Sequence, residues 1–460
     1  MSKASTPRRL WFNWLLTASC GIVLFVFNLR AQHEFNKSKL DDYLHQLEIN
    51  NKAMCGVVIT KEGKVEYQNY IGFSSVEDKI RNNHLTKFRI GSITKMFKAT
   101  IIFQLIEEGK LTLDTKLSKF YPQIPNSQEI TIADMLGHRS GIHNFTNDKE
   151  YKQYMTTKKS KKEMVELIAK LKPDFKPNEK TSYSNSNYVL LGYIIEEITN
   201  STYQNELESR ISAELNFSNT FYGNKINIKN SEAASYKFQH TTWDLQPETD
   251  MSIPHGAGAI VSTPYELTFF INALFNIRLI SENSLNQMKE IKEGLGKGLI
   301  RFPFGDKSAY GYNGGIDGFI SNLAYFPKEK VALAVTANGM NYNFNDILIG
   351  ILSIYFNVPF EIPDLTAKAI NLDSEELKNY EGEFSSKQLP LKITLKVEKG
   401  QFYSQATGQS PFPLTPFSKT EFRFDPAGII IEFVKDDEGN IQYNSFILNQ
   451  GGRKFTYEKQ

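Results

Sequence analysis

A serine and a lysine three residues apart carry the first chemical signal in the chain. Ser92 and Lys95 stand in Gly91-Ser92-Ile93-Thr94-Lys95, at the head of a strongly apolar stretch. Residues three apart share one face of a helix. A serine hydroxyl becomes a nucleophile when a neighbour takes its proton, and a desolvated lysine either takes it or holds a tyrosinate that does. The spacing therefore predicts a nucleophilic serine, with an N-cap serine beside a snorkelling lysine as the structural alternative.

A second signal is Tyr183-Ser184-Asn185, which follows a polar loop and precedes an apolar helical pattern. The tripeptide Tyr-x-Asn also occurs at Tyr67, Tyr203 and Tyr355, where it falls in predicted strands or helices. The copy at Tyr183 lies instead on a loop, where functional residues are concentrated. A tyrosine beside a lysine has its phenolate favoured and can act as a base, and an amide side chain can hold a substrate amide. We therefore expect Tyr183 to handle protons and Asn185 to bind substrate.

A third signal is the glycine-rich run from Tyr310 to Phe319, which contains Tyr312, Asn313, Gly314 and Gly315. Glycines in a strand allow another backbone or a ligand to approach closely. Backbone N–H groups there could stabilise an oxyanion or pair with an extended substrate, so we expect Tyr312, Asn313, Gly314 and Gly315 to bind substrate. By itself the run is also typical of an ordinary glycine-rich hairpin.

The elements that position these signals follow from periodicity and from glycine and proline breaks. Residues 92–108 are apolar nearly all round, which is typical of a helix buried in a core, and Gly109 ends the pattern. We expect strands at 54–60, 64–71, 319–326 and 331–336, and helices at 161–170, 188–199, 264–275 and 344–355. We interpret 130–279 as a mainly helical insertion and 294–298 as a strand that leads into the third signal. Strands from both ends of the segment then close one mixed sheet.

The C-terminal part has a different texture. Short alternating stretches near 391–397, 421–424, 429–433 and 443–448 are separated by glycine and Asp-Glu-Gly turns, which predicts a small all-β domain. The chain as a whole is therefore predicted to be α+β. We expect a mixed domain at 33–358, a proline-bearing linker at 359–375 and a β-rich accessory domain at 376–460.

The N-terminus predicts export. Lys3, Arg8 and Arg9 precede a run of 20 uncharged residues, 10–29, which is long enough for a helix to cross a bilayer. Positive charge before the run orients the N-terminus in the cytoplasm and sends the rest of the chain across. Residues 1–32 are thus expected to be a signal peptide or a membrane anchor. The anchor is favoured because no small-x-small cleavage site closes the run, and Cys20 leaves a lipoprotein as a further alternative.

Composition excludes several other classes. The 53 Lys and Arg residues nearly balance the 51 Asp and Glu residues, which argues against a nucleic acid partner. Two cysteines cannot build a disulfide scaffold or a cysteine zinc site. His138 and His143 lack the His-Glu-x-x-His pattern, so we expect structural histidines and no metal or cofactor. No Gly-x-Ser-x-Gly nucleophile elbow is present.

In this order and context, the three signals resemble the serine β-lactamase and penicillin-binding-protein superfamily. The similarity is to its class C β-lactamase-like branch, which includes D-alanyl-D-alanine carboxypeptidases and esterases. It covers roughly residues 44–355, including 135–141 and 256–263. The resemblance implies a β-lactamase/transpeptidase-like domain of antiparallel sheet plus helices, often followed by a β-rich accessory domain.

The resemblance also implies roles for individual residues. Ser92 would be acylated, Lys95 and Tyr183 would handle protons, and Asn185 would bind substrate. The Ser92 and Gly315 N–H groups would form the oxyanion hole. The chain departs from the family at Tyr312, where relatives usually carry Lys or His. Without a cation there, a carboxylate-bearing substrate is disfavoured relative to an ester or neutral amide.

Two functions therefore follow from the sequence. The first is an exported serine hydrolase of the periplasm or cell envelope, which forms an acyl-enzyme with a small-molecule or peptide amide or ester. The second is a catalytically weak envelope-binding protein with the same fold. Ser92, Lys95 and Tyr183 favour the first, and Tyr312 favours the second.

Overall fold

The computed structural model describes residues 34–460, apart from 240, 368, 425–426 and 451–452. The predicted signal or anchor segment, 1–32, lies outside the described residues. Within the described part, none of the helices combines the length and the apolar character that crossing a bilayer requires.

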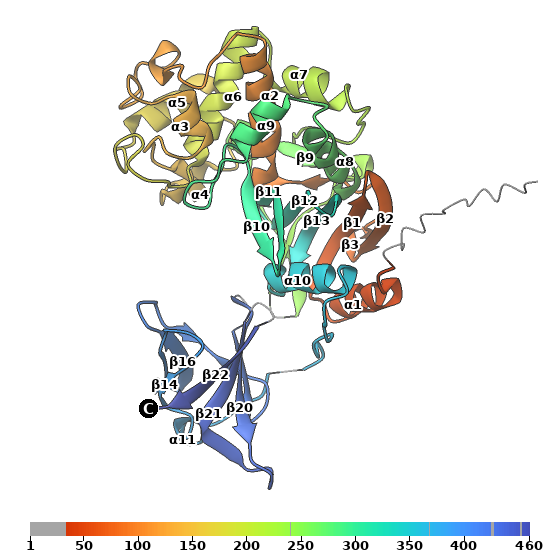
Figure 1. Ribbon diagram of the computed structural model, residues 1–460, viewed down its shortest axis with the longest axis vertical. Coiled ribbons are helices and arrows are strands. Elements are labelled where there is room, and N and C mark those ends of the chain that lie inside the picture. The colour runs from red at the N-terminus through yellow and green to blue at the C-terminus, as the bar shows by residue number, and fades with distance from the viewer. Residues whose placement is uncertain (1–33, 240, 368, 425–426, 451–452) are drawn as a thin grey trace, which may run out of the picture. The chain divides into compact units, whose positions relative to one another are not determined.

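An eight-stranded sheet forms the centre of the first part of the chain (Figure 1). Its main path is β10 (Ile300–Phe304), β11 (Lys307–Ile316), β12 (Phe319–Phe326), β13 (Val331–Met340), β1 (Ala53–Lys61) and β2 (Lys64–Ile71). These neighbours are antiparallel. β7 (Tyr236–Gln239) pairs in parallel with the end of β13, and β8 (Thr242–Leu245) pairs with β7. The N-terminal strands thus join the strands that follow residue 300, as predicted from the two ends of the segment.

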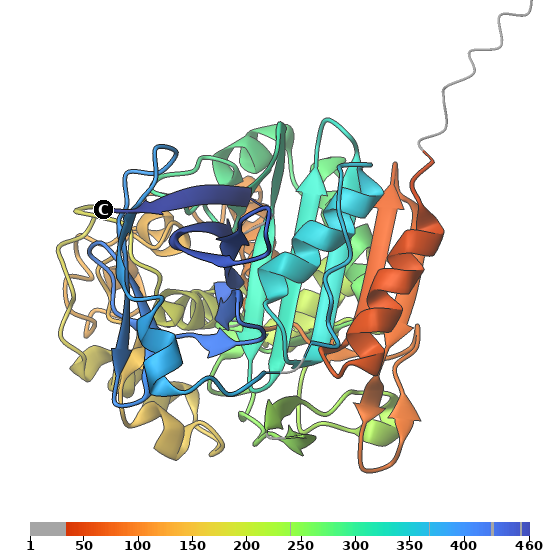
Figure 2. The ribbon, with the colours of Figure 1, turned by 90° about the horizontal axis from the view of Figure 1, so that it is seen from below.

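Helices cover both faces of this sheet. Its central strands, β1 and β13, are therefore buried almost throughout. Figure 2 shows α1 (Lys37–Ile49) and α10 (Phe344–Tyr355) side by side on one face. On the other face, α8 (Pro264–Phe275) packs against β13, β1 and β12. The remaining helices are α2 (Thr94–Glu107), α3 (Ile132–Leu136), α4 (Tyr151–Tyr154), α5 (Lys161–Lys170), α6 (Asn185–Thr199), α7 (Tyr203–Leu207), α9 (Glu282–Met288) and α11 (Ser374–Lys378).

The segment predicted as a helical insertion also contains short strands. β5 (Phe88–Arg89), β9 (Ile260–Ser262) and β6 (Phe221–Tyr222) form one small sheet, while β3 (Phe73–Ser75) pairs with β4 (Ile80–Arg81) before the insertion. The strand predicted at 294–298 is wrong. Gly294 and Gly298 have φ values of +89° and +84°, which belong to turns, and β10 starts only at Ile300.

The third signal lies in β11, which runs directly against the chain before Ser92. Gly314 lacks a side chain where a methyl group would overlap the carbonyl oxygen of Ile90 and the hydroxyl of Ser321. Ser321 also donates a hydrogen bond to Ile90 O at 2.9 Å. The two segments can touch because Gly314 has no side chain to hold their backbones apart.

The C-terminal part forms a separate nine-stranded sheet in the order β17-β16-β15-β14-β22-β21-β20-β19-β18. The strands are β14 (Gly382–Ser385), β15 (Ile393–Glu398), β16 (Gln401–Ala406), β17 (Phe412–Pro413), β18 (Thr415–Pro416), β19 (Glu421–Phe424), β20 (Ile429–Lys435), β21 (Ile441–Gln450) and β22 (Arg453–Lys459). Only Leu414 separates β17 from β18, although these strands occupy opposite edges. The sheet must therefore curl until its edges meet, which nearly closes a barrel.

The predicted fold class is confirmed: an α+β part of sheet and helices is followed by an all-β part. The α+β part has its own apolar core around α2 and α6, and the β part has an aromatic core that includes Tyr380, Phe422 and Phe446. The domain boundaries at 33–358, 359–375 and 376–460 stay a prediction.

Truncation tests those boundaries. A chain that ends at residue 365 loses the aromatic core of the β part and keeps the core around α2. We expect it to unfold cooperatively in a denaturant titration, with a smaller m-value than the full chain because less surface becomes exposed. Insolubility of every chain that ends between 358 and 375 would contradict an independent first domain.

Gly314→Ala and Gly315→Ala test the close approach of β11. The first change forces backbone apart and should destabilise the protein by about 1–3 kcal/mol. At Gly315 a methyl group meets nothing nearer than Phe319 O at 3.9 Å, so Gly315→Ala should unfold at nearly the wild-type denaturant concentration. Equal midpoints for the two variants would contradict the packing described.

Candidate active site

Ser92 lies in a tight turn that leads into the most buried helix of the protein. The 3-10 turn η1 (Gly91–Ile93) continues into α2, whose side chains are buried on nearly every side. Gly91 has φ +50°, a conformation that favours glycine, and a methyl group at Gly91 would lie 2.6 Å from Gly315 N. The turn therefore sets the start of α2 against β11.

Lys95 lies one turn beyond Ser92 and is fully buried. Its Nζ donates to Asn185 Oδ1 at 2.8 Å and to Ala257 O at 2.7 Å, and lies 2.9 Å from Ser92 Oγ. The two carbonyl oxygens can only accept hydrogen bonds. These two hydrogen bonds take two of the three directions around the Lys95 nitrogen that can form hydrogen bonds, and the third direction faces Ser92 Oγ.

Tyr183 approaches Ser92 from the loop before α6. Its hydroxyl lies 2.6 Å from Ser92 Oγ and donates to Asn185 Oδ1 at 3.3 Å. The structure thus brings together Ser92, Lys95, Tyr183 and Asn185, which come from distant parts of the sequence. Whether each has the role assigned to it stays a prediction.

Burial determines the protonation of the two groups beside Ser92. It lowers the pKa of Lys95 well below the 10.5 of an ordinary lysine. Burial also raises the pKa of Tyr183 to about 12, although its hydrogen bond with Ser92 opposes the rise. Removal from water disfavours the charged form of both groups. Burial therefore shifts Lys95 toward the neutral amine and Tyr183 toward the protonated phenol.

His138 lies behind Tyr183 and connects it to β11. The two rings stack with centroids 4.6 Å apart. Burial, and then the nearby Lys95, lower the pKa of His138 to about 3, so the ring is neutral. Its Nδ1 accepts a hydrogen bond from Ser184 N at 3.1 Å. The proton therefore lies on Nε2, which donates to the Tyr312 hydroxyl at 3.2 Å.

Tyr312 is thus placed differently from a substrate ligand. Its side chain is 2% exposed, and its hydroxyl is bonded to His138. The side chain of the next residue, Asn313, lies on the opposite face of β11, where its Oδ1 accepts a hydrogen bond from Asn322 Nδ2 at 2.7 Å. Of the five residues predicted to bind substrate, Asn185, Gly314 and Gly315 line the cavity over Ser92, whereas Tyr312 and Asn313 do not.

The cavity over Ser92 has a volume of about 890 Å³. Besides the residues above, apolar side chains such as Phe145, Met155 and Ile320 line it. Such a mixture is typical of sites that bind small organic groups. Among the described residues, no three His, Cys, Asp or Glu side chains converge as a metal site would require.

A buried ion pair ties the two sides of the site together. Arg89, just before the Ser92 turn, donates to Asp317 Oδ2 at 2.9 Å, and both side chains are almost inaccessible to water. Asp317, in the turn after β11, also accepts from Thr249 N and Oγ1. Sequence reasoning missed this pair, and it did not anticipate the contact of His138 with Tyr312 or that of the Ala257 carbonyl with Lys95. The basic residue three positions before Ser92 was the one local signal for the pair.

Comparison with known proteins now adds to the geometry. A family model described as Beta-lactamase matches residues 48–351, which is more than half of the chain. The chain is 27% identical over 324 residues to a teichoic acid D-alanine hydrolase of Staphylococcus aureus. That match covers 67% of this chain and 77% of the relative.

Solved structures show the same fold. A D-amino acid amidase from Ochrobactrum anthropi, complexed with L-phenylalanine amide, has a TM-score of 0.59 and 26% identity, and the match covers 70% of this chain and 95% of that one. The octameric penicillin-binding protein homologue from Pyrococcus abyssi has a TM-score of 0.65 and 23% identity, over 92% and 99% of the two chains. With the family model spanning the sheet, α2 and the cavity over Ser92, the chain belongs to the Beta-lactamase family.

Proposed function

We propose that this protein is an exported serine hydrolase that removes D-aminoacyl groups from esters or amides through an acyl-enzyme on Ser92. One observation carries the proposal: Ser92 Oγ has a buried lysine amine at 2.9 Å and a tyrosine hydroxyl at 2.6 Å. A nucleophile with two proton-handling groups at hydrogen-bond distance is what acyl transfer needs.

Acylation begins with proton transfer from Ser92. The neutral Lys95 amine accepts the Oγ proton while Oγ attacks the substrate carbonyl carbon, and the carbonyl oxygen becomes an oxyanion. The Ser92 and Gly315 N–H groups, which the glycines bring close together, stabilise that charge. The bond to the leaving group then breaks, and the leaving oxygen or nitrogen takes the proton from Lys95 through the Tyr183 hydroxyl.

Deacylation runs the same path with water. Water gives a proton to the Tyr183–Lys95 pair as its oxygen attacks the acyl carbon. The bond between that carbon and Ser92 Oγ breaks, and Ser92 regains the proton. Both half-reactions therefore use the same two groups, in opposite directions.

The substrate class follows from relatives and from the third signal together. The curated relative is a teichoic acid D-alanine hydrolase and a structural neighbour is a D-amino acid amidase. Both names describe a D-amino acid carbonyl bonded to a leaving group. In this chain the corresponding residue is Tyr312, whose hydroxyl is hydrogen-bonded to His138. At this position β11 therefore offers no cation to a substrate carboxylate. This supports an ester or amide without a nearby carboxylate over a D-alanyl-D-alanine peptide.

The proposed location is the cell envelope. The basic residues before the uncharged run at 10–29 support export and retention at the membrane. A catalytically weak binding protein is the less favoured alternative, because the contacts around Ser92 Oγ are those of an activated nucleophile. No feature of the cavity favours binding alone.

Substitutions at Ser92, Lys95 and Tyr183 test the mechanism with D-alanyl glycerol ester as substrate. Ser92→Ala should abolish turnover and the mass increase of an acyl-enzyme. Lys95→Met and Tyr183→Phe should each lower kcat about 100- to 10,000-fold, because each removes a proton-transfer group. The double variant should be hardly slower than the worse single variant, since the two residues serve one step.

Two neighbouring residues provide matched controls. Lys98 is a fully buried lysine on α2, and the Tyr188 hydroxyl on α6 donates to Leu136 O, away from Ser92. Lys98→Met and Tyr188→Phe should keep most of the activity. Multiplicative losses in the Lys95 and Tyr183 double variant would show that the two residues act independently.

The pH dependence tests which group is the base. If neutral Lys95 accepts the proton, kcat/KM for an ester without ionisable groups rises as pH passes upward through the Lys95 pKa. Because burial lowers that pKa, the rise lies below pH 10.5. No fall should follow until pH nears 12, where Tyr183 ionises. A fall near the Lys95 pKa would instead show that the reaction needs the charged amine and a tyrosinate base.

A further inference from the structure

The carbonyl oxygen of Ala257, which accepts a hydrogen bond from Lys95 at 2.7 Å, belongs to a very short turn. This 3-10 turn, η6 (His255–Ala257), is buried throughout. His255 has φ +36°, a conformation that residues other than glycine adopt rarely, although histidine adopts it more often than most. Contacts from outside the turn must therefore hold the Ala257 oxygen against the amine.

The His255 side chain anchors the turn among aromatic rings. It stacks on Tyr193 of α6 with ring centroids 4.6 Å apart. Tyr203 from α7 and Tyr222 from β6 meet it edge to face, with centroids at 5.5 and 5.7 Å. Gly192 lets the ring lie close to α6, since a methyl group at Gly192 would be 2.7 Å from His255 Nε2. The ring is thus enclosed by three separate elements.

One hydrogen bond sets the direction of this ring. The Tyr222 hydroxyl donates its proton to Met251 O at 2.9 Å. It therefore accepts from His255 Nδ1, which lies 3.1 Å away, so the ring proton is on Nδ1. Burial, and then the nearby Lys98 and Lys161, hold the pKa of His255 well below 6.5, so the ring is neutral. Its bare Nε2 has no hydrogen-bond partner among the described residues.

Ionisable side chains face His255 from every element around it. They are Lys98 on α2, Lys161 on α5, Tyr193 and Glu196 on α6, Tyr203 on α7 and Tyr222 on β6. The Glu196 carboxylate lies 3.8 Å from Nε2, which is too far for a hydrogen bond. A neutral ring forms no ion pair with it, so the bond to Tyr222 is what orients the ring.

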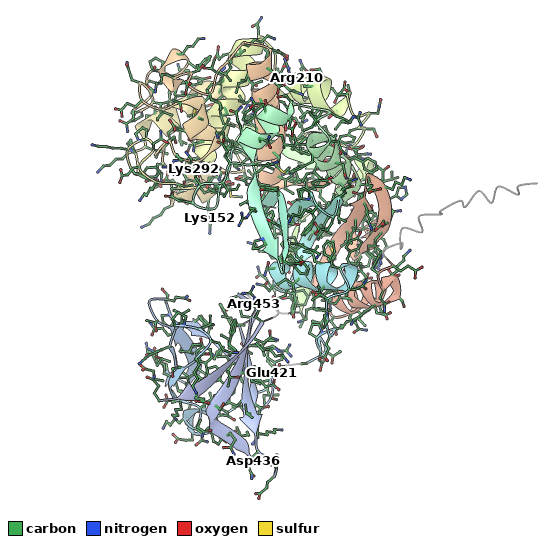
Figure 3. All side chains as sticks on the ribbon, in the orientation of Figure 1. Lys152, Arg210, Lys292, Glu421, Asp436 and Arg453 are labelled. Atoms are coloured by element: carbon green, nitrogen blue, oxygen red, sulfur yellow. The ribbon has the colours of Figure 1, made fainter. Side chains whose placement is uncertain are left out.

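The elements around His255 are themselves fixed to the helix that carries Lys95. That helix, α2, packs against both α6 and α7 (Figure 1). Arg210, labelled in Figure 3 beside the end of α2, donates to Glu206 of α7 at 2.6 Å. It also donates to Glu108, which directly follows α2, at 3.2 Å. A shift of the His255 ring would therefore move the turn relative to the Lys95 amine.

We propose that His255 is a positioning residue for the reaction at Ser92, and that its hydrogen bond to Tyr222 holds the Ala257 carbonyl on the Lys95 amine. This rests on the proposed function and adds residues that line no part of the cavity over Ser92. Without the Ala257 oxygen, the amine keeps one fixed acceptor and can turn away from Ser92 Oγ. A misplacement of 1 Å can slow a reaction about 100-fold.

Three substitutions separate the hydrogen bond from the shape of the ring. His255→Phe keeps a ring but has no donor, and Tyr222→Phe removes the acceptor. His255→Asn keeps a donor and tolerates a positive φ, but it loses the ring. The measurement is the rate at which a small alkyl fluorophosphonate phosphonylates Ser92, followed by intact mass. This reaction needs an activated serine and does not depend on the natural substrate.

The two phenylalanine variants should each react about tenfold to a hundredfold more slowly than the wild type. The double variant should be hardly slower than the worse single variant, because the two changes remove one hydrogen bond. His255→Asn should react faster than either, since it restores the donor.

Tyr203→Phe is the matched control. The Tyr203 ring meets His255 edge to face as the Tyr222 ring does, but its hydroxyl has no hydrogen-bond partner among the described residues. Its loss should therefore leave the rate unchanged.

The pH profile distinguishes positioning from a loss of stability. The hydrogen bond to Ala257 O favours the charged Lys95 amine, because a cation is the stronger donor. When that oxygen moves away, the pKa of Lys95 falls further. In the two phenylalanine variants the rise of the rate with pH should therefore move to lower pH, by about one unit. Tyr203→Phe should keep the wild-type profile.

A wild-type rate and profile in Tyr222→Phe would overturn the proposal. So would a His255→Asn variant slower than His255→Phe, since the packing of the ring would then explain the effect. If His255→Phe does not fold, Tyr222→Phe still gives the answer, because it keeps both rings. A wild-type protein that is phosphonylated at Ser92 but hydrolyses no D-alanyl ester would refute the proposed function and leave the positioning role measurable.

Discussion

The hydrogen bonds from the buried Lys95 amine to two carbonyl oxygens organise the rest of this site. Asn185 Oδ1 comes from the start of α6, and Ala257 O from the turn η6 (His255–Ala257). Both oxygens are obligate acceptors, so they orient the amine and leave its third direction for Ser92. The helix α2, which carries Lys95 and directly follows the turn with Ser92, must therefore pack against both segments before the amine can face Ser92.

Removing an amine from water is expensive, and the site reduces the cost by keeping charge low. Burial favours neutral Lys95, and the neighbouring His138 is neutral as well. Tyr312 fits this scheme. A lysine at that position would place a positive charge near Lys95, whereas the phenol accepts a hydrogen bond from His138 and adds no charge. The departure from the family pattern is thus part of an internally consistent polar network.

The two sides of the site are held by backbone contact and by one buried ion pair. Gly314 lets β11 touch Ile90, and Gly91 brings the Ser92 turn to Gly315. Arg89 and Asp317 then join the same two segments through charge, with Thr249 as a third member. Steric contact sets the distance between the segments, while the ion pair limits their sliding. The proposed oxyanion hole would need both, because its two donors, the Ser92 and Gly315 N–H groups, belong to different segments.

The sequence by itself determined the local elements and the types of residue on which the proposed chemistry depends. The helices at 161–170, 264–275 and 344–355 have the predicted bounds, because caps and periodicity act within a few residues. The spacing of Ser92 and Lys95 likewise acts within one helical turn. The fold class and the family were recognisable from these motifs, while the segment before residue 34 and the domain boundaries stay predictions.

Only the tertiary structure decided which groups meet. Ala257 is an ordinary residue whose carbonyl matters through its position, and His138 acquired a role only once its ring was stacked on Tyr183. Tyr312 was expected to face substrate, but the alternation of β11 and the packing of His138 bury it. Local pattern encodes side-chain type and secondary structure. The partners of a buried polar group depend on contacts between residues 46 to 174 positions apart, which no local pattern contains.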